Sequence, residues 1–225
     1  MEFDYIIVGG GTAGCVLANR LSANPKTRVL LLEAGKSDNY HWVHVPIGYL
    51  YCIGNPRTDW MMKTAAEPGL NGRSLTYPRG KVLGGCSSVN GMIYMRGQAA
   101  DYDGWRQMGN AGWGWDDVLP YFLRSEDHHD ADRELHQSGG EWKVSRQRLR
   151  WDVLEAVQEG AKEFGIEPTP DFNTGTNEGS GFFEVNQKNG VRWNTAKAFL
   201  RPAMKRPNLK VMTQAHTHRI TLDGK

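Results

Sequence analysis

The strongest constraint on the fold is a glycine-rich turn between a short apolar strand and a helix. Residues 5–8 form an apolar run typical of a strand that is buried on both faces of a parallel sheet. The turn at residues 9–14 has the spacing G-x-G-x-x-G, and residues 15–21 continue as a helix. A second apolar strand at residues 28–33 completes a strand–helix–strand unit of about 30 residues. The sequence therefore predicts an α/β fold with a Rossmann-like parallel sheet.

Each part of this unit has a physical role in binding a dinucleotide. Gly9 permits the tight turn, Gly11 lets a pyrophosphate approach the backbone, and Gly14 lets the helix pack closely on the strand. The helix N-terminus presents free N–H groups and the positive end of its dipole to the phosphates. Glu33 closes the second strand, where its carboxylate can accept hydrogen bonds from the adenosine ribose. The unit predicts a dinucleotide site; its place near the start of the chain favours FAD over NAD only mildly.

A second segment rich in glycine and serine, residues 77–91, is more informative. It reads YPRGKVLGGCSSVNG, and its small residues let the backbone lie against a flat ligand. Val82 and Leu83 supply apolar contact, and Asn90 supplies an amide that can hydrogen-bond the edge of a ring. A flexible loop would need neither this apolar pair nor the Ile-Tyr-Met that follows at residues 93–95.

These motifs resemble the glucose–methanol–choline oxidoreductases. Residues 79–103 are similar to the first signature motif of that family, and residues 1–35 to its FAD-binding turn. Shorter matches to its choline-dehydrogenase-like branch lie at residues 59–60, 101–105, 113–115, 171–173, 186–187 and 190–192. The resemblance implies a Rossmann-like FAD-binding fold that carries the first part of an inserted α+β substrate domain.

The resemblance also implies a set of cofactor-binding residues. The turn and the end of the second strand would contribute Gly9, Gly11, Thr12, Ala13, Gly14, Glu33 and Ala34. Trp60 would lie near the cofactor, and the ADP part and ribityl chain would be lined by Arg79, Gly80, Val82, Gly84, Gly85 and Ser87. The isoalloxazine ring would be bordered by Asn90, Gly91, Met92 and Ile93. Thr217 falls where the family has an adenine contact that is more usually apolar.

Two departures from the family's pattern concern the cofactor and the thiols. Val89 stands where some members carry a histidine that attaches the flavin covalently, so FAD is expected to bind non-covalently. Cys86 stands where many members carry serine or another small residue, and a thiol is small enough to fit. With Cys15 and Cys52 it shows neither metal-ligand nor disulfide spacing, which favours a reducing compartment and predicts no metal site.

No catalytic residue is assigned within the chain. Members of the family pass hydride from an alcohol carbon to flavin N5, while a histidine near the C-terminus takes the hydroxyl proton. That part of the family's sequence would follow Lys225, so the chain alone is expected to be inactive. The histidines present have no acid at motif spacing and are interpreted as surface or structural residues: His41, His44, His128, His129, His136, His216 and His218.

Three functions are consistent with the sequence. The leading hypothesis is part of an FAD-dependent oxidase or dehydrogenase for a primary or aryl alcohol. The alternatives are a flavin-dependent lyase or photodecarboxylase of the same fold, and a truncated, non-catalytic FAD-binding fragment. A hairpin signal at Asp223-Gly224 argues against the last, because a lone terminal strand leaves an unpaired edge. The expected partner is therefore the C-terminal remainder of the same protein, with a nick or an introduced boundary at Lys225.

Composition excludes several other classes. A net charge of +2, spread evenly, does not favour nucleic acid or an anionic membrane as a partner. No apolar run approaches the roughly 20 residues of a membrane helix, and no signal peptide is present, so a cytoplasmic protein is expected. The expected organisation is an FAD-binding domain at residues 1–140, a first substrate-domain segment at 141–207, and a return strand at 208–225.

Local patterns predict the remaining elements. Residues 34–78 are irregular, and residues 128–137 are polar and typical of a surface loop. Helices are predicted near Asp101, over residues 116–125 with Asp116 as N-cap, over 151–164 before Gly165, and over 194–204. Strands are predicted at residues 181–187 and 209–222.

Overall fold

The computed structural model describes residues 2–131 and 134–222, which form two compact units. Unit 1 comprises residues 1–91 and 191–225, and unit 2 comprises residues 92–190. The units thus divide after residues 91 and 190. The functional domains predicted from the sequence have their boundaries after residues 140 and 207, and this division stays a prediction. The hairpin turn predicted at Asp223-Gly224 lies outside the described residues.

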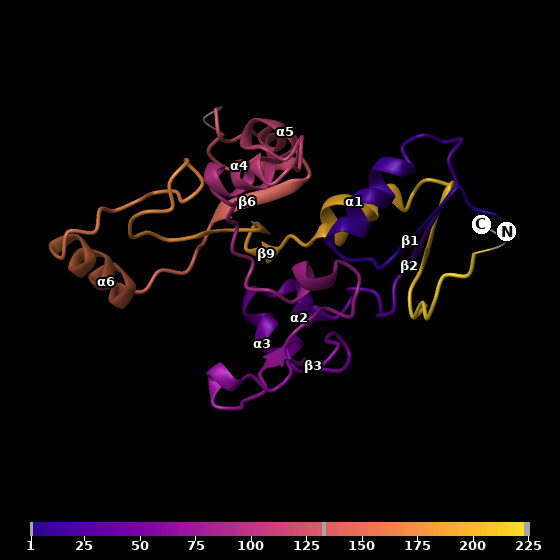
Figure 1. Ribbon diagram of the computed structural model, residues 1–225, viewed down its shortest axis with the longest axis horizontal. Helices are drawn as coiled ribbons and strands as arrows, with labels where there is room; N and C mark the ends of the chain where they lie inside the picture. The colour runs from indigo at the N-terminus through magenta and orange to yellow at the C-terminus, as the bar shows by residue number, and fades with distance from the viewer. Residues whose placement is uncertain (1, 132–133, 223–225) are drawn as a thin grey trace. The chain divides into compact units, whose positions relative to one another are not determined.

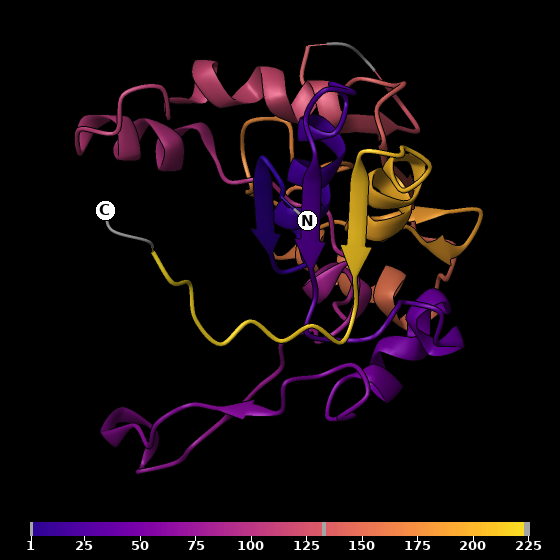
Figure 2. The same ribbon diagram turned by 90° about the vertical axis from the view of Figure 1, so that its right-hand side faces the viewer.

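Unit 1 is built on a three-stranded parallel sheet with the order β1-β2-β10. The strands are β1 (Tyr5–Val8), β2 (Val29–Leu32) and β10 (Leu209–Met212), and Figure 2 shows their arrows side by side and pointing the same way. Their residues are mostly Val, Ile and Leu, which suit a pleated surface. The predicted α/β class with a parallel, Rossmann-like sheet is confirmed.

β1 is an edge strand in unit 1, which corrects the expectation that both of its faces are buried. Ile7 is 8% exposed, whereas Ile6 and Val8 are 59% and 54% exposed. β2 takes the central place because it pairs with β1 on one side and with β10 on the other. Within the described residues, α1 packs on the face of β1 that carries Ile7, and the opposite face, with Ile6 and Val8, stays exposed.

Helix α1 (Thr12–Leu21) lies against this sheet, as Figure 1 shows. Its other neighbours are a π-helix (Ala196–Leu200) and the short α7 (Arg201–Ala203), which together replace the single helix predicted over residues 194–204. Cys15 and Ala18 are fully buried in this contact. Small side chains here let α1 approach both layers closely, which holds the helix N-terminus at the end of β1.

Residues 34–78 are irregular, as predicted, and contain only short elements. These are α2 (His41–His44), a 3₁₀ turn (Pro46–Gly48), α3 (Tyr49–Cys52), β3 (Met62–Lys63), a second 3₁₀ turn (Pro68–Leu70) and β4 (Thr76–Tyr77). The second motif follows and includes a 3₁₀ turn (Gly85–Ser88). A buried cluster of Val43, Cys52, Val82 and Val89 holds this region to the second motif.

The chain leaves the sheet after Met212, which corrects the strand predicted over residues 209–222. Gln214 has a left-handed φ of 58°, and this turns the backbone away from β10. The Gln214 N–H then donates to the Gly35 carbonyl at 2.8 Å, and the Ala215 N–H donates to the Glu33 carbonyl at 2.9 Å. The segment therefore lies across the carboxyl end of β2 instead of extending the sheet.

Unit 2 combines three helices with a small sheet of order β5-β6-β7. Its strands are β5 (Glu126–His128), β6 (Trp142–Arg146) and β7 (Glu184–Val185). Its helices are α4 (Ala99–Gln107), α5 (Trp115–Ser125) and α6 (Asp152–Glu163). Unit 2 also contains the short strand β8 (Gln187–Lys188), and the short strand β9 (Val191–Arg192) belongs to unit 1. None of the helices in residues 2–131 and 134–222 combines the length and apolar character that a membrane crossing needs.

Two expectations for unit 2 are corrected. The N-cap of α5 is Gly114 rather than the predicted Asp116, and the Gly114 N–H donates to Oδ2 of Asp117, the N3 residue, at 3.0 Å. The segment expected to be a polar surface loop contains two buried side chains, because His128 and His136 are only 6% and 3% exposed. Their partners come from distant parts of the chain, which a local pattern does not reveal.

Candidate cofactor site

The two glycine-rich motifs meet in unit 1 beyond the carboxyl ends of β1 and β2. The Gly84 N–H donates to the Gly10 carbonyl oxygen at 2.7 Å. A Cβ on Gly85 would lie only 2.7 Å from the Gly11 Cα, so glycine is required for this approach. The contact builds one site from two segments that are far apart in the sequence, at the position where open parallel sheets bind ligands.

A pocket of about 300 Å³ lies where these motifs meet. The sequence-predicted residues that line it are Gly9, Gly11, Glu33, Ala34, Trp60, Gly80, Gly85 and Thr217. An adjoining hollow shares part of this lining and adds Thr12 and Arg79. The pocket therefore unites residues from the first motif, the second motif and the segment that follows β10.

Helix α1 begins at this pocket. Gly11 is its N-cap and lines the pocket, and the first turn contains no acidic residue. The first N–H groups of an α-helix have no acceptor within the helix, and the positive end of the dipole lies there. A Cβ on Gly14 would overlap the Gly9 carbonyl oxygen, so a glycine lets the helix start this close to the strand. This end of α1 fits a phosphate group.

The Glu33 carboxylate is fixed in the wall of the pocket. It is 5% exposed; Oε2 accepts a hydrogen bond from the Gly10 N–H and Oε1 accepts one from the Gly35 N–H, both at 2.7 Å. Each carboxylate oxygen has a further lone pair. The carboxylate can therefore shape the turn and still accept a hydrogen bond from a ribose hydroxyl.

Trp60 and His216 form an aromatic wall of the pocket. Their ring centroids lie 5.4 Å apart with an interplanar angle of 69°, and the Lys81 ammonium lies 4.7 Å from the centroid of the Trp60 ring. His216 also stacks on His218 at 4.9 Å. Edge-to-face aromatic pairs are stabilising, and the face of either ring can stack on a planar ligand. The interpretation of His216 as a surface or structural residue missed this position, because Trp60 belongs to a distant segment.

Several predicted residues have internal roles instead of lining the pocket. The Ser87 hydroxyl donates to the Gly84 carbonyl at 2.6 Å and accepts from the Thr195 N–H at 3.0 Å. Val82 is 1% exposed and belongs to the apolar cluster, and Ala13 lies within the first turn of α1. These residues hold the backbone of the two motifs in place.

Arg192 is a buried cation that the sequence did not single out. It is fully buried; its Nη1 donates to Asn90 Oδ1 at 2.9 Å and to the Ser87 carbonyl at 3.1 Å, and its Nε donates to the Val43 carbonyl at 2.7 Å. Burial lowers the pKa of Arg192 to about 10. The guanidinium therefore orients the Asn90 side chain, next to Gly91.

Met92 and Ile93 belong to unit 2, unlike the other predicted cofactor residues. The Met92 carbonyl accepts a hydrogen bond from the Asn186 N–H at 2.8 Å, and Met92 has a left-handed φ of 64°. Their place beside the isoalloxazine ring stays a prediction.

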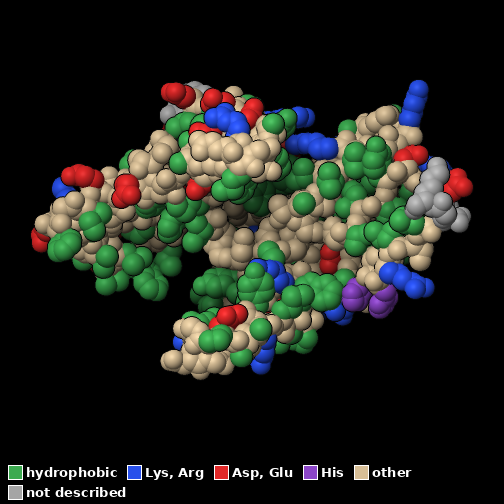
Figure 3. Space-filling model, in the orientation of Figure 1, with side chains coloured by type: hydrophobic (Ala, Val, Ile, Leu, Met, Phe, Trp, Pro, Cys, Tyr) green, Lys and Arg blue, Asp and Glu red, His purple; other side chains and the backbone are tan. Residues whose placement is uncertain are grey.

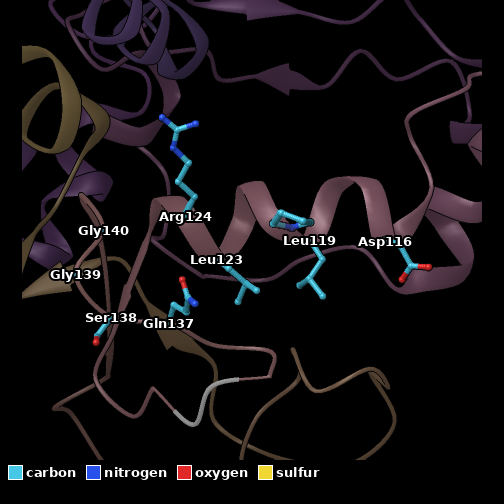
Figure 4. A pocket seen from close by; sticks show the side chains of 9 residues that line it. Asp116, Leu119, Leu123, Arg124, Gln137, Ser138, Gly139 and Gly140 are labelled. Atoms are coloured by element: carbon cyan, nitrogen blue, oxygen red, sulfur yellow. The ribbon is translucent and has the colours of Figure 1, made fainter. Parts of the chain in front are cut away.

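Another hollow, of about 600 Å³, lies within unit 2 beside α5 (Figure 4). Leu119 and Leu123 supply its apolar wall, Asp116 and Arg124 lie at the two ends of the labelled row on α5, and residues 137–140 line it from a turn. None of its lining residues belongs to the glycine-rich motifs or is a histidine or cysteine. The unit 1 pocket is therefore the candidate cofactor site.

Comparison with known sequences identifies the family. Residues 3–225 match the family described as GMC oxidoreductase. The chain belongs to the GMC oxidoreductase family. It is 42% identical over 224 residues to an alcohol dehydrogenase [acceptor] of Pseudomonas putida, covering 99% of this chain and 41% of that protein. It is 41% identical over 212 residues to an oxygen-dependent choline dehydrogenase of Sinorhizobium fredii, covering 94% of this chain and 39% of that protein. The chain thus spans about two fifths of these relatives.

Solved structures of GMC oxidoreductases have the same fold. Pyridoxine 4-oxidase from Mesorbium loti superposes with a TM-score of 0.94 at 33% identity, covering 99% of this chain and 44% of that one. A formate oxidase superposes with a TM-score of 0.85 at 28% identity, covering 98% and 40%. GMC oxidoreductases are FAD-dependent flavoproteins, so the prediction of FAD is confirmed. Val89 is 3% exposed and carries no group that could bond to the flavin, which is consistent with non-covalent binding.

Proposed function

We propose that this chain is the cofactor-binding part of an FAD-dependent oxidoreductase that oxidises a primary or aryl alcohol. The observation that carries the proposal is the unit 1 pocket, where the N-terminus of α1, the buried Glu33 carboxylate and the Trp60 ring meet. The names of the relatives, an alcohol dehydrogenase and a choline dehydrogenase, support an alcohol as substrate. Bound FAD would supply the acceptor, flavin N5, for hydride leaving the alcohol carbon.

The lining of the pocket suggests a role for each residue. The pyrophosphate would lie against Gly9 and Gly11, where the N–H groups of α1 attract negative charge. The Arg79 guanidinium, 3.7 Å from the centroid of the Tyr77 ring, lines the adjoining hollow and adds positive charge there. Glu33 would accept from the adenosine ribose.

The adenine would lie against the aromatic wall. Trp60 and His216 each offer a ring on which a planar base can stack, and Thr217 lines the same pocket. Asn90, held by Arg192, and the residues after it would border the isoalloxazine ring. Val89 offers no covalent attachment, so the proposal includes non-covalent FAD.

The proposal assigns the catalytic base to the part of the protein that lies beyond this chain. The relatives are about two and a half times as long as the match, so the C-terminal remainder is the proposed partner. Exposed apolar side chains support this: Ile6 and Val8 on β1, and Val153 and Val157 on α6 with Phe164 at its C-cap, at 61%, 61% and 87% exposure. Figure 3 shows hydrophobic side chains gathered along α6. Soluble proteins rarely expose contiguous apolar surface unless another surface covers it.

The free thiols Cys15, Cys52 and Cys86 support a cytoplasmic location.

Titration of FAD into the purified protein tests the proposal. Quenched flavin fluorescence that saturates at one FAD per chain is expected, together with no alcohol-dependent reduction of an acceptor dye by the chain alone. Adding the C-terminal remainder should then produce dye reduction with benzyl alcohol or choline. An FAD-loaded complete protein that turns over neither alcohol would favour the lyase or photodecarboxylase alternative. Failure to bind FAD at all would contradict the proposal.

A further inference from the structure

Unit 2 contains a buried cluster of histidines and carboxylates that the proposed function does not use. It is defined here as Glu126, His128, His136, Asp171 and Glu184, all with side chains 15% exposed or less. Glu126 and His128 lie on β5 and Glu184 on β7, while His136 and Asp171 lie in loops. Charged groups are costly to bury unless they are paired, so the pairing in this cluster is informative.

His136 is the only member of the cluster with a carboxylate at each ring nitrogen. Its Nδ1 lies 2.9 Å from Glu126 Oε1, and its Nε2 lies 2.8 Å from Asp171 Oδ2. A neutral imidazole has one N–H and one nitrogen lone pair. An unprotonated nitrogen on either side would hold its partial negative charge within 2.9 Å of a carboxylate oxygen and be repelled. The Nε2 contact is not aligned as a hydrogen bond, so it is mainly a Coulombic attraction.

Glu126 is itself held as an anion. Its Oε2 accepts hydrogen bonds from Arg96 Nη2 at 2.9 Å and from the Gln137 N–H at 3.1 Å, while Oε1 faces His136. A carboxylate that accepts from three donors is stabilised in its ionised form. The proton between Glu126 and His136 therefore belongs to the imidazole.

We propose that His136 is a doubly protonated imidazolium that clamps the loop carrying Asp171 onto β5 and releases this loop when it loses a proton. The loop is held at a second point by Asn173, whose Oδ1 accepts from the Arg96 N–H at 2.8 Å and whose Nδ2 donates to the Tyr94 carbonyl at 3.4 Å. Arg96 also carries the ion pair to Glu126. The clamp thus ties together the loop, β5 and the segment around Tyr94.

This segment begins with Met92 and Ile93, which are expected to border the flavin ring. Loss of the His136 proton at alkaline pH would therefore loosen the backbone that is expected to face the cofactor. This link, unlike the clamp itself, rests on the proposed function. Release of Asp171 would loosen Asn173, and with it the hydrogen bonds to Arg96 and Tyr94.

The charges around His136 decide the direction of its titration. Burial alone lowers the pKa of His136, but Asp171 and Glu126 outweigh burial and raise it to about 9. His128, stacked on His136 at 4.0 Å, contributes opposing positive charge, which Glu184 partly offsets from β7 at 2.7 Å from His128 Nε2. Arg96 lies at the Oε2 atom of Glu126, away from the Oε1 atom that faces His136, and its Nε donates to the Tyr94 hydroxyl at 3.1 Å. Because the pKa is raised on folding, the stabilisation is complete below a pH of about 6.5 and is lost as the pH rises through about 9.

The same cluster offers two sets of atoms that a metal ion could reach. The ligand atoms of Glu126, His128 and His136 lie within 4.8 Å of one another, as do those of His128, His129 and Glu184. Two imidazoles that bind one ion must aim their nitrogens at one point. Here the His128 ring stacks on His136 and on His129, with interplanar angles of 24° and 26°. His128 Nδ1 lies 2.9 Å from the Asp130 carbonyl oxygen, while His128 Nε2, His129 Nε2 and both His136 nitrogens lie against carboxylates. The geometry therefore favours protons over a shared metal ion.

Nitrogen-15 NMR of the imidazole side chains tests the clamp directly in the unmodified protein. Near neutral pH both nitrogens of His136 should carry a proton, and one should be lost with a midpoint near pH 9. The His136→Gln spectrum assigns the signals. After division by the intrinsic rate, which itself rises with pH, amide hydrogen exchange at Asn173 and Arg96 should speed up by tenfold or more above that midpoint, with no such step in His136→Gln. His41→Gln, an exposed histidine of unit 1, is the control and should behave as the wild type.

Three outcomes would overturn the clamp. The first is a single protonated nitrogen on His136 near neutral pH. The second is an unchanged alkaline step in His136→Gln. The third is zinc that raises the melting temperature in wild type but not in His128→Gln, which would identify a metal site instead. FAD binding is measured separately, so its failure with an intact imidazolium signal would count against the proposed function alone.

Discussion

The Oε2 atom of Glu33 accepts a hydrogen bond from the backbone N–H of Gly10 at 2.7 Å. This bond joins the carboxyl end of β2 to the turn that follows β1. The other oxygen holds the Gly35 N–H at the same distance, and the Ala215 N–H reaches the Glu33 carbonyl. One residue therefore fixes the turn and the crossing segment and also lines the pocket.

Glu33→Gln should weaken both folding and FAD binding. The amide NH₂ would face a backbone N–H, so one buried hydrogen bond is lost at a cost of about 1–3 kcal/mol. FAD affinity should fall by about tenfold or more, since about 1.4 kcal/mol is a factor of ten. Urea unfolding and flavin fluorescence titration measure the two effects. Glu163→Gln, an exposed change on α6, is the control; equal FAD affinity in both variants would contradict the role of Glu33.

Gly14→Ala should separate α1 from β1. The new methyl group overlaps the Gly9 carbonyl oxygen, so the helix must move, at a cost of about 1–3 kcal/mol. Gly104→Ala is the matched control, because its methyl group meets nothing within 4 Å in helix α4. That change should stabilise the protein by about 0.5–1 kcal/mol. Thermal melting distinguishes them, and two variants with the same melting temperature would show that the close approach at Gly14 is unimportant.

Cys86 should be the reactive thiol of the native protein. It is exposed, whereas Cys15 and Cys52 are fully buried. Burial raises the pKa of Cys15 to about 11 and also raises the pKa of Cys52, so few thiolates form there. Mass spectrometry after brief alkylation should find the label on Cys86, and FAD should slow it because Cys86 lines the hollow beside the pocket. Equal labelling with and without FAD would place the cofactor elsewhere.

Removing one partner of the buried Arg96–Glu126 ion pair should cost far more than breaking a surface pair. Glu126 is fully buried, and the Arg96 side chain is 2% exposed. Glu126→Gln leaves a buried cation without its anion, at a cost of about 3–5 kcal/mol. Asp103→Asn breaks the exposed pair with Arg106 and should cost less than about 1 kcal/mol. Urea unfolding of the two variants should rank them in this order, and the reverse order would refute it.

Denaturation should release the flavin completely. Val89 has no nucleophilic atom, so the FAD-loaded protein should give a yellow supernatant and a colourless pellet after acid precipitation. Absorption spectra of both fractions measure this. Flavin that stays with the polypeptide would show a covalent link through another side chain.

Parts of the site were predictable because their signals are local. The turn at residues 9–14 and the acidic residue after the second strand have fixed spacing along the chain, and the structure brings both to one pocket. Other members have no local signal. His216 lines the pocket only because the backbone turns at Gln214, and Arg192 supports Asn90 through a contact across 102 positions of sequence.

By itself, the sequence determined the βαβ unit and the helices of unit 2, because apolar periodicity and glycine spacing act between near neighbours. FAD as the cofactor followed from the resemblance of the two glycine-rich motifs to a known family. Only the tertiary structure decided that β2 is central and β1 an edge, since strand order depends on which distant strand pairs with β2. It also decided that His128 and His136 are buried. Glu184 and Asp171 reach them from distant loops and strands, and burial of an ionisable group becomes favourable only once such partners are in place.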